Sequence, residues 1–186
     1  MASLAQTFPR TLTERGNDIS TLELTPNLSE LAPRIFSEEP GIVKMVVDGG
    51  GKKHRMKLSV PRVALPEWFV PSLRRCAPLL VLPFDWNRGG APPVEAGAIQ
   101  LAMDALWCFM ADRSSIPQWT PTAAGGVQLD WHEKGIDLEI EFPPSAAEGY
   151  VVFSDNRDRE ADWDGPISRY QAQLQSIFKN RLVSDR

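Results

Sequence analysis

The clearest hydrophobic alternation in the chain lies in residues 127–142, VQLDWHEKGIDLEIEF. Lys134 and Gly135 fit the two central positions of a tight turn, where glycine is favoured. With that turn, residues 127–133 pair in reverse order with residues 136–142, and the large apolar pairs fall on one side. A shift by one residue would expose the apolar side chains to water. The pattern therefore predicts a β-hairpin of defined register.

The two faces of this hairpin are expected to differ sharply. The face predicted to pack on the core carries Val127, Leu129, Trp131, Leu138, Ile140 and Phe142. The opposite, polar face carries Gln128, Asp130, His132, Asp137, Glu139 and Glu141. On the polar face Asp130 and Glu139 are directly opposed, which costs a few tenths of a kcal/mol to about 1 kcal/mol. A solvated sheet face tolerates such a pair, and a covering cation would relieve it.

Weaker patterns predict the remaining elements. Residues 41–60 alternate around the triple glycine at 49–51, which predicts a second hairpin, and EGYVVFSD (148–155) predicts a strand. Residues 94–113 are apolar on most of a helical circumference, as in a buried helix. A closing amphipathic helix is expected after Asp164, a candidate N-cap, with Pro166 in its first turn. Two proline-punctuated segments stay open: residues 67–76 form a short helix or an extended run, and residues 79–84 a buried strand or a packed loop.

Together these elements predict an α+β fold. An antiparallel β-meander packs on a buried central helix, with an N-terminal β-hairpin and a C-terminal amphipathic helix added to it. Residues 1–40 are expected to form a partly irregular arm, with a short strand at 19–26 and loop or one helical turn in the rest. Residues 41–186 are expected to form a single α+β domain.

Composition places the chain among globular proteins, with 42% hydrophobic and 24% charged residues in a length of 186. No apolar run approaches the roughly 18 residues that span a bilayer, and the N-terminus lacks a signal peptide's apolar core. We therefore expect a cytoplasmic location without membrane contact. The two cysteines and two histidines have no zinc-ligand spacing, and both cysteines are expected to be small buried hydrophobic residues.

Negative charge is concentrated in one part of the chain. Residues 130–164 hold 3 Lys or Arg and 11 Asp or Glu, a net charge of −8, whereas the whole chain has a net charge of −4. A local acidic field favours basic partners or cations and disfavours nucleic acid at that surface. Besides the six polar hairpin residues, the candidate binding residues are those of the following loop, namely Asp155, Asp158, Glu160 and Asp162.

Other chemistry at the same residues has weaker support. His132 beside Asp137 has the composition of a general acid–base pair, but no serine or cysteine nucleophile is near in sequence. The alternating acids from Asp158 to Asp164 resemble a calcium loop without its central glycine and its twelfth-position glutamate. We therefore predict no catalytic residue, no metal ligand and no cofactor. The covering cation is either a basic partner or the chain's own Lys179 and Arg181.

Two motifs flank the predicted central helix, FDWNRGGAPP (84–93) and GGVQLDW (125–131). Together they resemble a family of small, uncharacterised bacterial proteins with the pattern W-[DN]-x-G-[GA]-A-x-P followed by G-G-V-Q-[LF]-x-W. The resemblance covers residues 80–155. It departs from the usual W-D-G-x-G at Asn87 and Arg88, which replace an aspartate and the first glycine. No function is established for that family, and the resemblance implies a partner-binding or antitoxin-type module.

The sequence thus predicts a non-enzymatic protein-binding module of the bacterial cytoplasm, of antitoxin, immunity or accessory type. Its acidic hairpin face would engage a basic protein partner. One alternative is a metal-assisted hydrolase or nuclease that uses Asp130, His132, Asp137 and Glu139. A second alternative is a structural subunit of a larger assembly. The sequence is also compatible with an oligomer.

Overall fold

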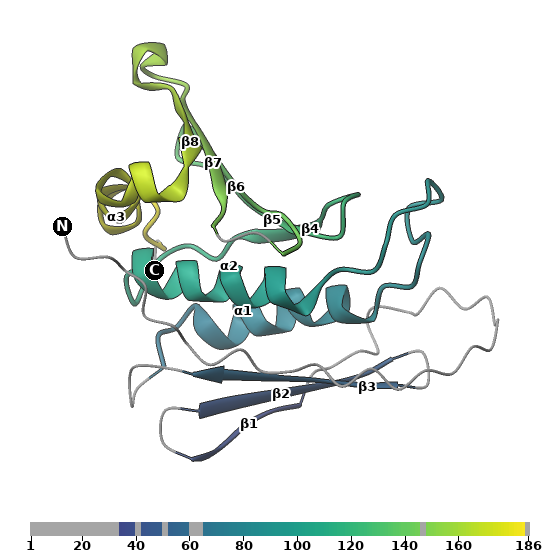
Figure 1. Cartoon of the computed structure of the whole chain (residues 1–186). Coiled ribbons are helices and arrows are strands. Elements are labelled where there is room, and N and C mark those ends of the chain that lie inside the picture. The colour runs from purple at the N-terminus through teal and green to yellow at the C-terminus, as the bar shows by residue number, and fades with distance from the viewer. Residues whose placement is uncertain (1–33, 40–41, 50–51, 60–64, 146–147, 185–186) are drawn as a thin grey trace.

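The computed structural model describes residues 34–39, 42–49, 52–59, 65–145 and 148–184. A smaller sheet, a layer of helices and a larger sheet are stacked, with the helices in the middle (Figure 1). Helices and antiparallel strands occupy separate layers, which confirms the predicted α+β class.

The larger sheet is an antiparallel meander whose strands pair in chain order. Its strands are β4 (Gln118–Pro121), β5 (Val127–Glu133), β6 (Ile136–Phe142), β7 (Tyr150–Asp155) and β8 (Trp163–Pro166). The three central strands match the predicted ones. The two edge strands, β4 and β8, were not predicted, because each has four residues and includes a proline, which edge strands tolerate.

The smaller sheet contains β1 (Arg34–Glu39), β2 (Ile42–Gly49) and β3 (Lys52–Ser59) in that order. Gly49 pairs with Lys52, so the predicted N-terminal hairpin is confirmed. The prediction of loop or a helical turn is wrong for residues 34–39, because they form β1 against β2. The strand predicted at 19–26 lies outside the described residues.

The helical layer consists of α1 (Phe69–Cys76), the 3-10 turn η2 (Ala77–Val81) and α2 (Ala96–Phe109). The segment predicted as a short helix or an extended run at 67–76 is thus helical from Phe69 onward, and the segment predicted as strand or loop at 79–84 begins inside η2. The closing helix α3 (Gln171–Asn180) follows η4 (Ile167–Arg169) and starts later than predicted. Asp164 does not cap it, because residues 163–166 pair with β7 as strand β8.

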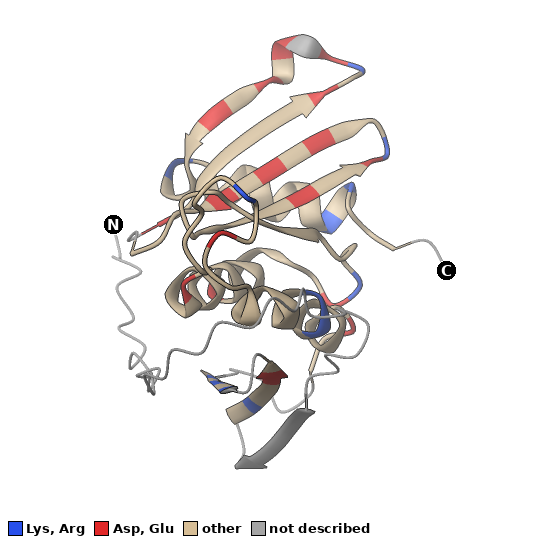
Figure 2. Cartoon of the chain, turned by 90° about the vertical axis from the view of Figure 1, so that its right-hand side faces the viewer, with Lys and Arg blue, Asp and Glu red and all other residues tan. Residues whose placement is uncertain are grey.

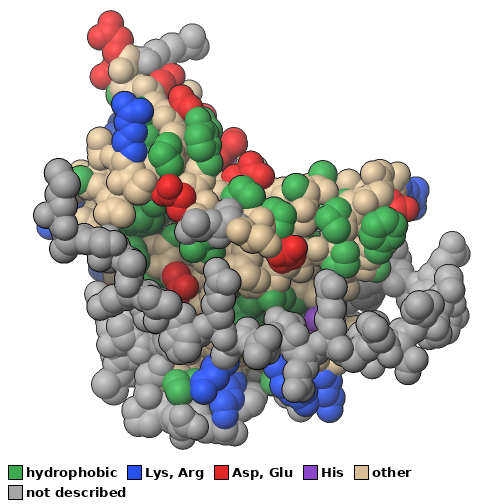
Figure 3. Space-filling view, viewed as in Figure 1, with side chains coloured by type: hydrophobic (Ala, Val, Ile, Leu, Met, Phe, Trp, Pro, Cys, Tyr) green, Lys and Arg blue, Asp and Glu red, His purple; other side chains and the backbone are tan. Residues whose placement is uncertain are grey.

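Each sheet turns one face towards the helices and one face outward. Figure 2 looks onto the outward face of the larger sheet, where the positions of acidic residues form bands across neighbouring strands. Figure 3 shows Lys and Arg side chains gathered over the smaller sheet at the other end of the molecule. On that sheet Arg55 and Lys57 are exposed, whereas Met56 and Leu58, which alternate with them, are buried. The two outward faces therefore differ in charge.

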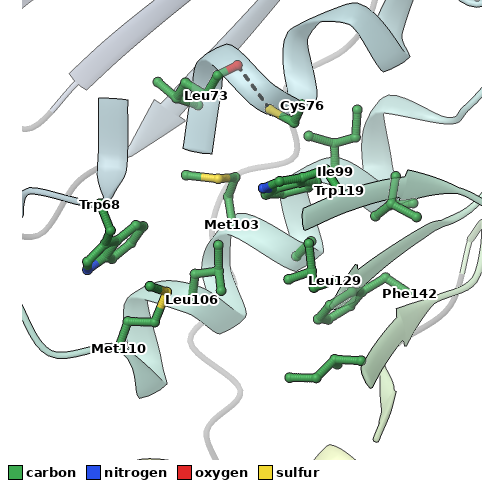
Figure 4. Close-up of a cluster of buried hydrophobic side chains, with 14 of the residues drawn as sticks. Trp68, Leu73, Cys76, Ile99, Met103, Leu106, Met110, Trp119, Leu129 and Phe142 are labelled. Carbon is green, nitrogen blue, oxygen red and sulfur yellow. Dashed lines mark hydrogen bonds between the residues drawn. The ribbon is translucent and has the colours of Figure 1, made fainter. Parts of the chain in front are cut away.

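One hydrophobic core joins both sheets to the helices (Figure 4). Met103 of α2 lies in this core with Leu73 of α1, Leu129 of β5 and Phe142 of β6. Because α2 lies between α1 and the larger sheet (Figure 1), it is apolar on more than one side. Cys76 is buried as predicted, but Cys108 is exposed near the end of α2, so the prediction of two buried cysteines is wrong for Cys108.

Candidate functional site

The polar surface of the hairpin is built by the turn between β5 and β6. Lys134 and Gly135 both have positive φ angles, 55° and 79°, as a two-residue turn of this twist requires. All seven predicted pairs, from Val127 with Phe142 to Glu133 with Ile136, are present. The register prediction is therefore confirmed.

The alternation of side chains divides the hairpin into a buried and an open face. The six predicted core residues are each at most 2% exposed. On the opposite face lie the six predicted polar residues, Gln128, Asp130, His132, Asp137, Glu139 and Glu141. The side chains of His132 and Asp137 are 52% and 41% exposed. We call this outward surface of β4 to β8 the open face.

Asp130 is the exception on the open face, because its exposure is only 8%. Two side chains donate hydrogen bonds to its carboxylate: Thr120 of β4 to Oδ2 at 3.1 Å and Gln128 to Oδ1 at 2.6 Å. The same Gln128 amide donates to Oε2 of Glu139 at 3.3 Å. One amide therefore bridges the two directly opposed carboxylates and offsets part of their repulsion.

His132 and Asp137 form a pair across the hairpin. Nδ1 of His132 lies 2.9 Å from Oδ1 of Asp137. This hydrogen bond is the main cause that raises the pKa of His132 above its ordinary value, and the negative charges of Asp137, Asp130 and Glu139 add to it. The ring is therefore biased towards its cationic form at the exposed end of an acidic surface.

A second arrangement on the open face has the composition of a metal site. Three potential ligand atoms, one each from Asp130, His132 and Glu139, all lie within 4.8 Å of one another. Asp137 holds the ring of His132, which resembles the carboxylate partner that orients metal-binding histidines. Nitrogen and oxygen ligands of this kind suit several divalent transition metals.

Asp155, also a predicted binding residue, lies on the other side of the sheet. It pairs with the buried Ile136 and is only 7% exposed. The backbone N–H of Arg157 and the guanidinium of Arg181, each at 3.0 Å, donate to its carboxylate and hold the pKa of Asp155 below its ordinary value. The structure thus separates Asp155 from the open face. Arg181, one of the two intramolecular cations expected over the acids, binds there instead.

The three other acids of the β7–β8 connection serve local structure or remain exposed. Oδ1 of Asp158 accepts the backbone N–H of Glu160 at 3.2 Å and caps the 3-10 turn η3 (Arg159–Ala161). Oδ1 of Asp162 accepts the backbone N–H of Asp155 at 3.0 Å. The side chain of Glu160 is exposed. This connection lies at the far end of the sheet (Figure 1), so its acids extend the negative field beyond the open face.

The open face also includes side chains that the sequence reasoning missed. On β7, Tyr150 is opposite Glu141 and Val152 is opposite Glu139. On β8, Asp164 is opposite Val152, and its carboxylate accepts a hydrogen bond from the Tyr150 hydroxyl, which raises the pKa of Tyr150. The signal was present, since Tyr150 and Val152 alternate with the apolar Val151 and Phe153 in EGYVVFSD.

The chain matches no family model, no curated protein and no solved structure. The resemblance built on Trp86 to Pro93 and Gly125 to Trp131 therefore stays a prediction. Within the described residues no helix is long and apolar enough to cross a membrane. The open face itself is thus the main guide to function.

Proposed function

We propose that the chain is a non-enzymatic protein-binding module that engages a basic protein partner through the open face of its larger sheet. We place it in the bacterial cytoplasm as a module of antitoxin, immunity or accessory type. The observation that carries the proposal is the gathering of Asp130, Asp137, Glu139 and Glu141 on one outward sheet surface.

Charge and shape both support this proposal. Residues 130–164 have a net charge of −8, so the field at this surface attracts cationic groups and repels nucleic acid phosphates. Such a field accelerates encounter with a basic partner and weakens with added salt. Asp137, Glu139 and Glu141 also lie at every second position of one strand and so share one face, which lets a single partner segment reach all three.

The test is affinity capture from lysate at low salt with three forms of the protein. The wild type is compared with Glu139→Lys plus Glu141→Lys, which reverses the open face at side chains that are at least partly exposed. Glu67→Lys plus Asp112→Lys makes the same change of charge at two exposed positions outside both sheets and serves as the control.

We expect the wild type and the control to retain the same basic protein, and the open-face variant to lose it. Retention by wild type should also fall between 50 and 300 mM salt. Capture of the same proteins by all three forms would refute the proposal, and so would recovery of the wild type alone at low salt.

A metal-assisted hydrolase or nuclease is a second candidate function, favoured by the close approach of Asp130, His132 and Glu139. A thermal-shift series with Mg²⁺, Mn²⁺ and Zn²⁺ tests it, because a metal that binds only the native state raises Tm. A rise of several degrees that disappears in Glu139→Gln would favour this candidate. An unchanged Tm with all three ions would remove it.

A further inference from the structure

The open face carries an apolar stripe between two acidic borders. Tyr150 and Val152 on β7 are 46% and 45% exposed and are among the few large hydrophobic side chains that are exposed in the described residues. On β6 they are opposed by Glu141 and Glu139, and on β8 Val152 is opposed by Asp164. A path across the sheet through Val152 thus meets acidic, apolar and acidic side chains in turn, whereas Tyr150 is opposite Pro166 on β8.

The spacing of this pattern fits a helix. Neighbouring strands lie about 4.8 Å apart, so β6 and β8 are separated by about 10 Å. An α-helix with its side chains is about 10–12 Å across. A helix that lies over β7 would place its lowest side chains on Tyr150 and Val152 and its two flanks over Glu139 and Asp164.

The topology disfavours a bound strand at the same place. Strand β7 is already paired with β6 on one side and with β8 on the other, so it offers no free ladder of backbone groups. A partner over β7 must therefore bind through side chains. An amphipathic helix does so with one apolar stripe at positions i, i+3, i+4 and i+7.

The surroundings leave room for an elongated partner. The larger sheet rises above the segment between η2 and α2 (Figure 1), and no described element lies in front of the upper part of its open face as Figure 2 draws it. Figure 2 shows the same segment in front of one end of the sheet. Phe84 on this segment is 69% exposed, so it offers a further apolar contact to a partner that reaches this segment.

We infer that the occupant of the open face is a basic amphipathic helix of a partner protein. Its apolar stripe lies on Tyr150 and Val152, and its Lys or Arg residues flank that stripe on both sides. This inference rests on the proposed function and names the kind of segment that the partner presents.

The test uses two synthetic 18-residue peptides with the same Leu and Lys content. One places leucine at helical spacing between rows of lysine, and the other has the scrambled order. Fluorescence anisotropy at 50 mM salt compares their affinities for the wild type, for Val152→Ser and for Val152→Glu. Leu65→Ser, a change of an exposed apolar residue outside the sheet, is the control.

We expect the amphipathic peptide to bind wild type and control at least tenfold more tightly than the scrambled one. Val152→Ser should weaken it about fivefold, the loss expected when roughly half a valine side chain is no longer buried. Val152→Glu should weaken it further, although the added charge favours a basic peptide.

Two results would overturn the inference in distinguishable ways. Equal binding of both peptides, with tighter binding by Val152→Glu than by wild type, would support an acidic binding face but refute a helical partner segment. Binding of neither peptide by the wild type at low salt would count against the helix and the proposed function together.

Discussion

The side-chain amide of Gln128 bridges the opposed carboxylates of Asp130 and Glu139 on the open face. Replacement of Gln128 by leucine tests whether this bridge stabilises the fold. The amide bonds the mostly buried Asp130 at 2.6 Å and Glu139 at 3.3 Å. Leucine has a similar size but no donor, so the change removes both hydrogen bonds and leaves the two carboxylates facing each other.

The expected loss follows from these contacts. A hydrogen bond to a charged group contributes about 1.5–3 kcal/mol, and the short bond to buried Asp130 belongs in that range. The longer bond to Glu139 adds less, and directly opposed like charges cost up to about 1 kcal/mol. We therefore expect Gln128→Leu to lower the free energy of unfolding by about 2–3 kcal/mol. In urea the midpoint should fall by about 1 M or more.

A double-mutant cycle separates relief of repulsion from simple loss of a hydrogen bond. If the amide offsets the repulsion, Glu139→Gln should recover about 1 kcal/mol in the Gln128→Leu background. Thr120→Val is the matched control, because Thr120 bonds the other oxygen of Asp130 and not Glu139. Because it removes another bond to the charged Asp130, it should cost about 1.5–3 kcal/mol, with no coupling to Glu139→Gln.

Urea denaturation followed by far-UV circular dichroism measures the three single variants and their combinations. A loss under about 0.5 kcal/mol for Gln128→Leu would refute the bridging role. Equal coupling of Gln128→Leu and Thr120→Val to Glu139→Gln would also contradict it, because the coupling would then not depend on the bridge.

Three further predictions concern single side chains. The pKa of His132 should lie above its ordinary value of 6.5 by NMR titration and should fall in Asp137→Asn. Because this pKa is raised by folding, the small stabilisation by the pair is complete below pH 6.5 and is lost as the pH rises through the folded pKa. Burial raises the pKa of the Cys76 thiol to about 12, so iodoacetamide at pH 8 should label Cys108 and should label Cys76 only after denaturation. Leu129→Ala removes a fully buried side chain and should lower the free energy of unfolding by about 2–5 kcal/mol in urea titration.

The hairpin could be predicted residue by residue because two independent signals agree there. The turn dipeptide at 134–135 and the alternation on either side each select the same register. The apolar circumference of residues 94–113 likewise predicted a buried helix, which the structure has over Ala96–Phe109, since only a helix covered on several sides is apolar on most of its surface.

The missed elements have no such local signal. Trp163 to Pro166 form β8 although Gly165 and Pro166 both have low strand propensity, and only pairing with β7 makes the segment extended. Asp164 has the residue type of an N-cap, and that local preference was outweighed by the tertiary pairing. Residues 34–39 are similarly extended because β2 offers them a partner.

The position of Asp155 shows what the charge pattern could not reveal. Composition groups Asp155 with the acids around it, but parity along β7 places it with Val151 and Phe153 on the inward face. Its partner Arg181 follows a helix 26 residues later, and no spacing rule connects the two. A charged residue at an inward position is a signal for an internal ion pair, because an unpaired buried carboxylate is costly.

The fold does not require acidic side chains on the open face. The register and the core are set by the inward side chains of β5 and β6, which are each at most 2% exposed from Val127 to Trp131 and from Ile136 to Phe142. A neutral polar residue in place of Glu139 would keep that packing and the hydrogen bonds to Asp130, and would avoid a repulsion that costs up to about 1 kcal/mol. Stability alone therefore gives no reason for two opposed carboxylates that need the amide of Gln128 between them. A cationic partner gives one, because binding over Glu139 and Glu141 converts the repulsion into attraction at the moment of contact.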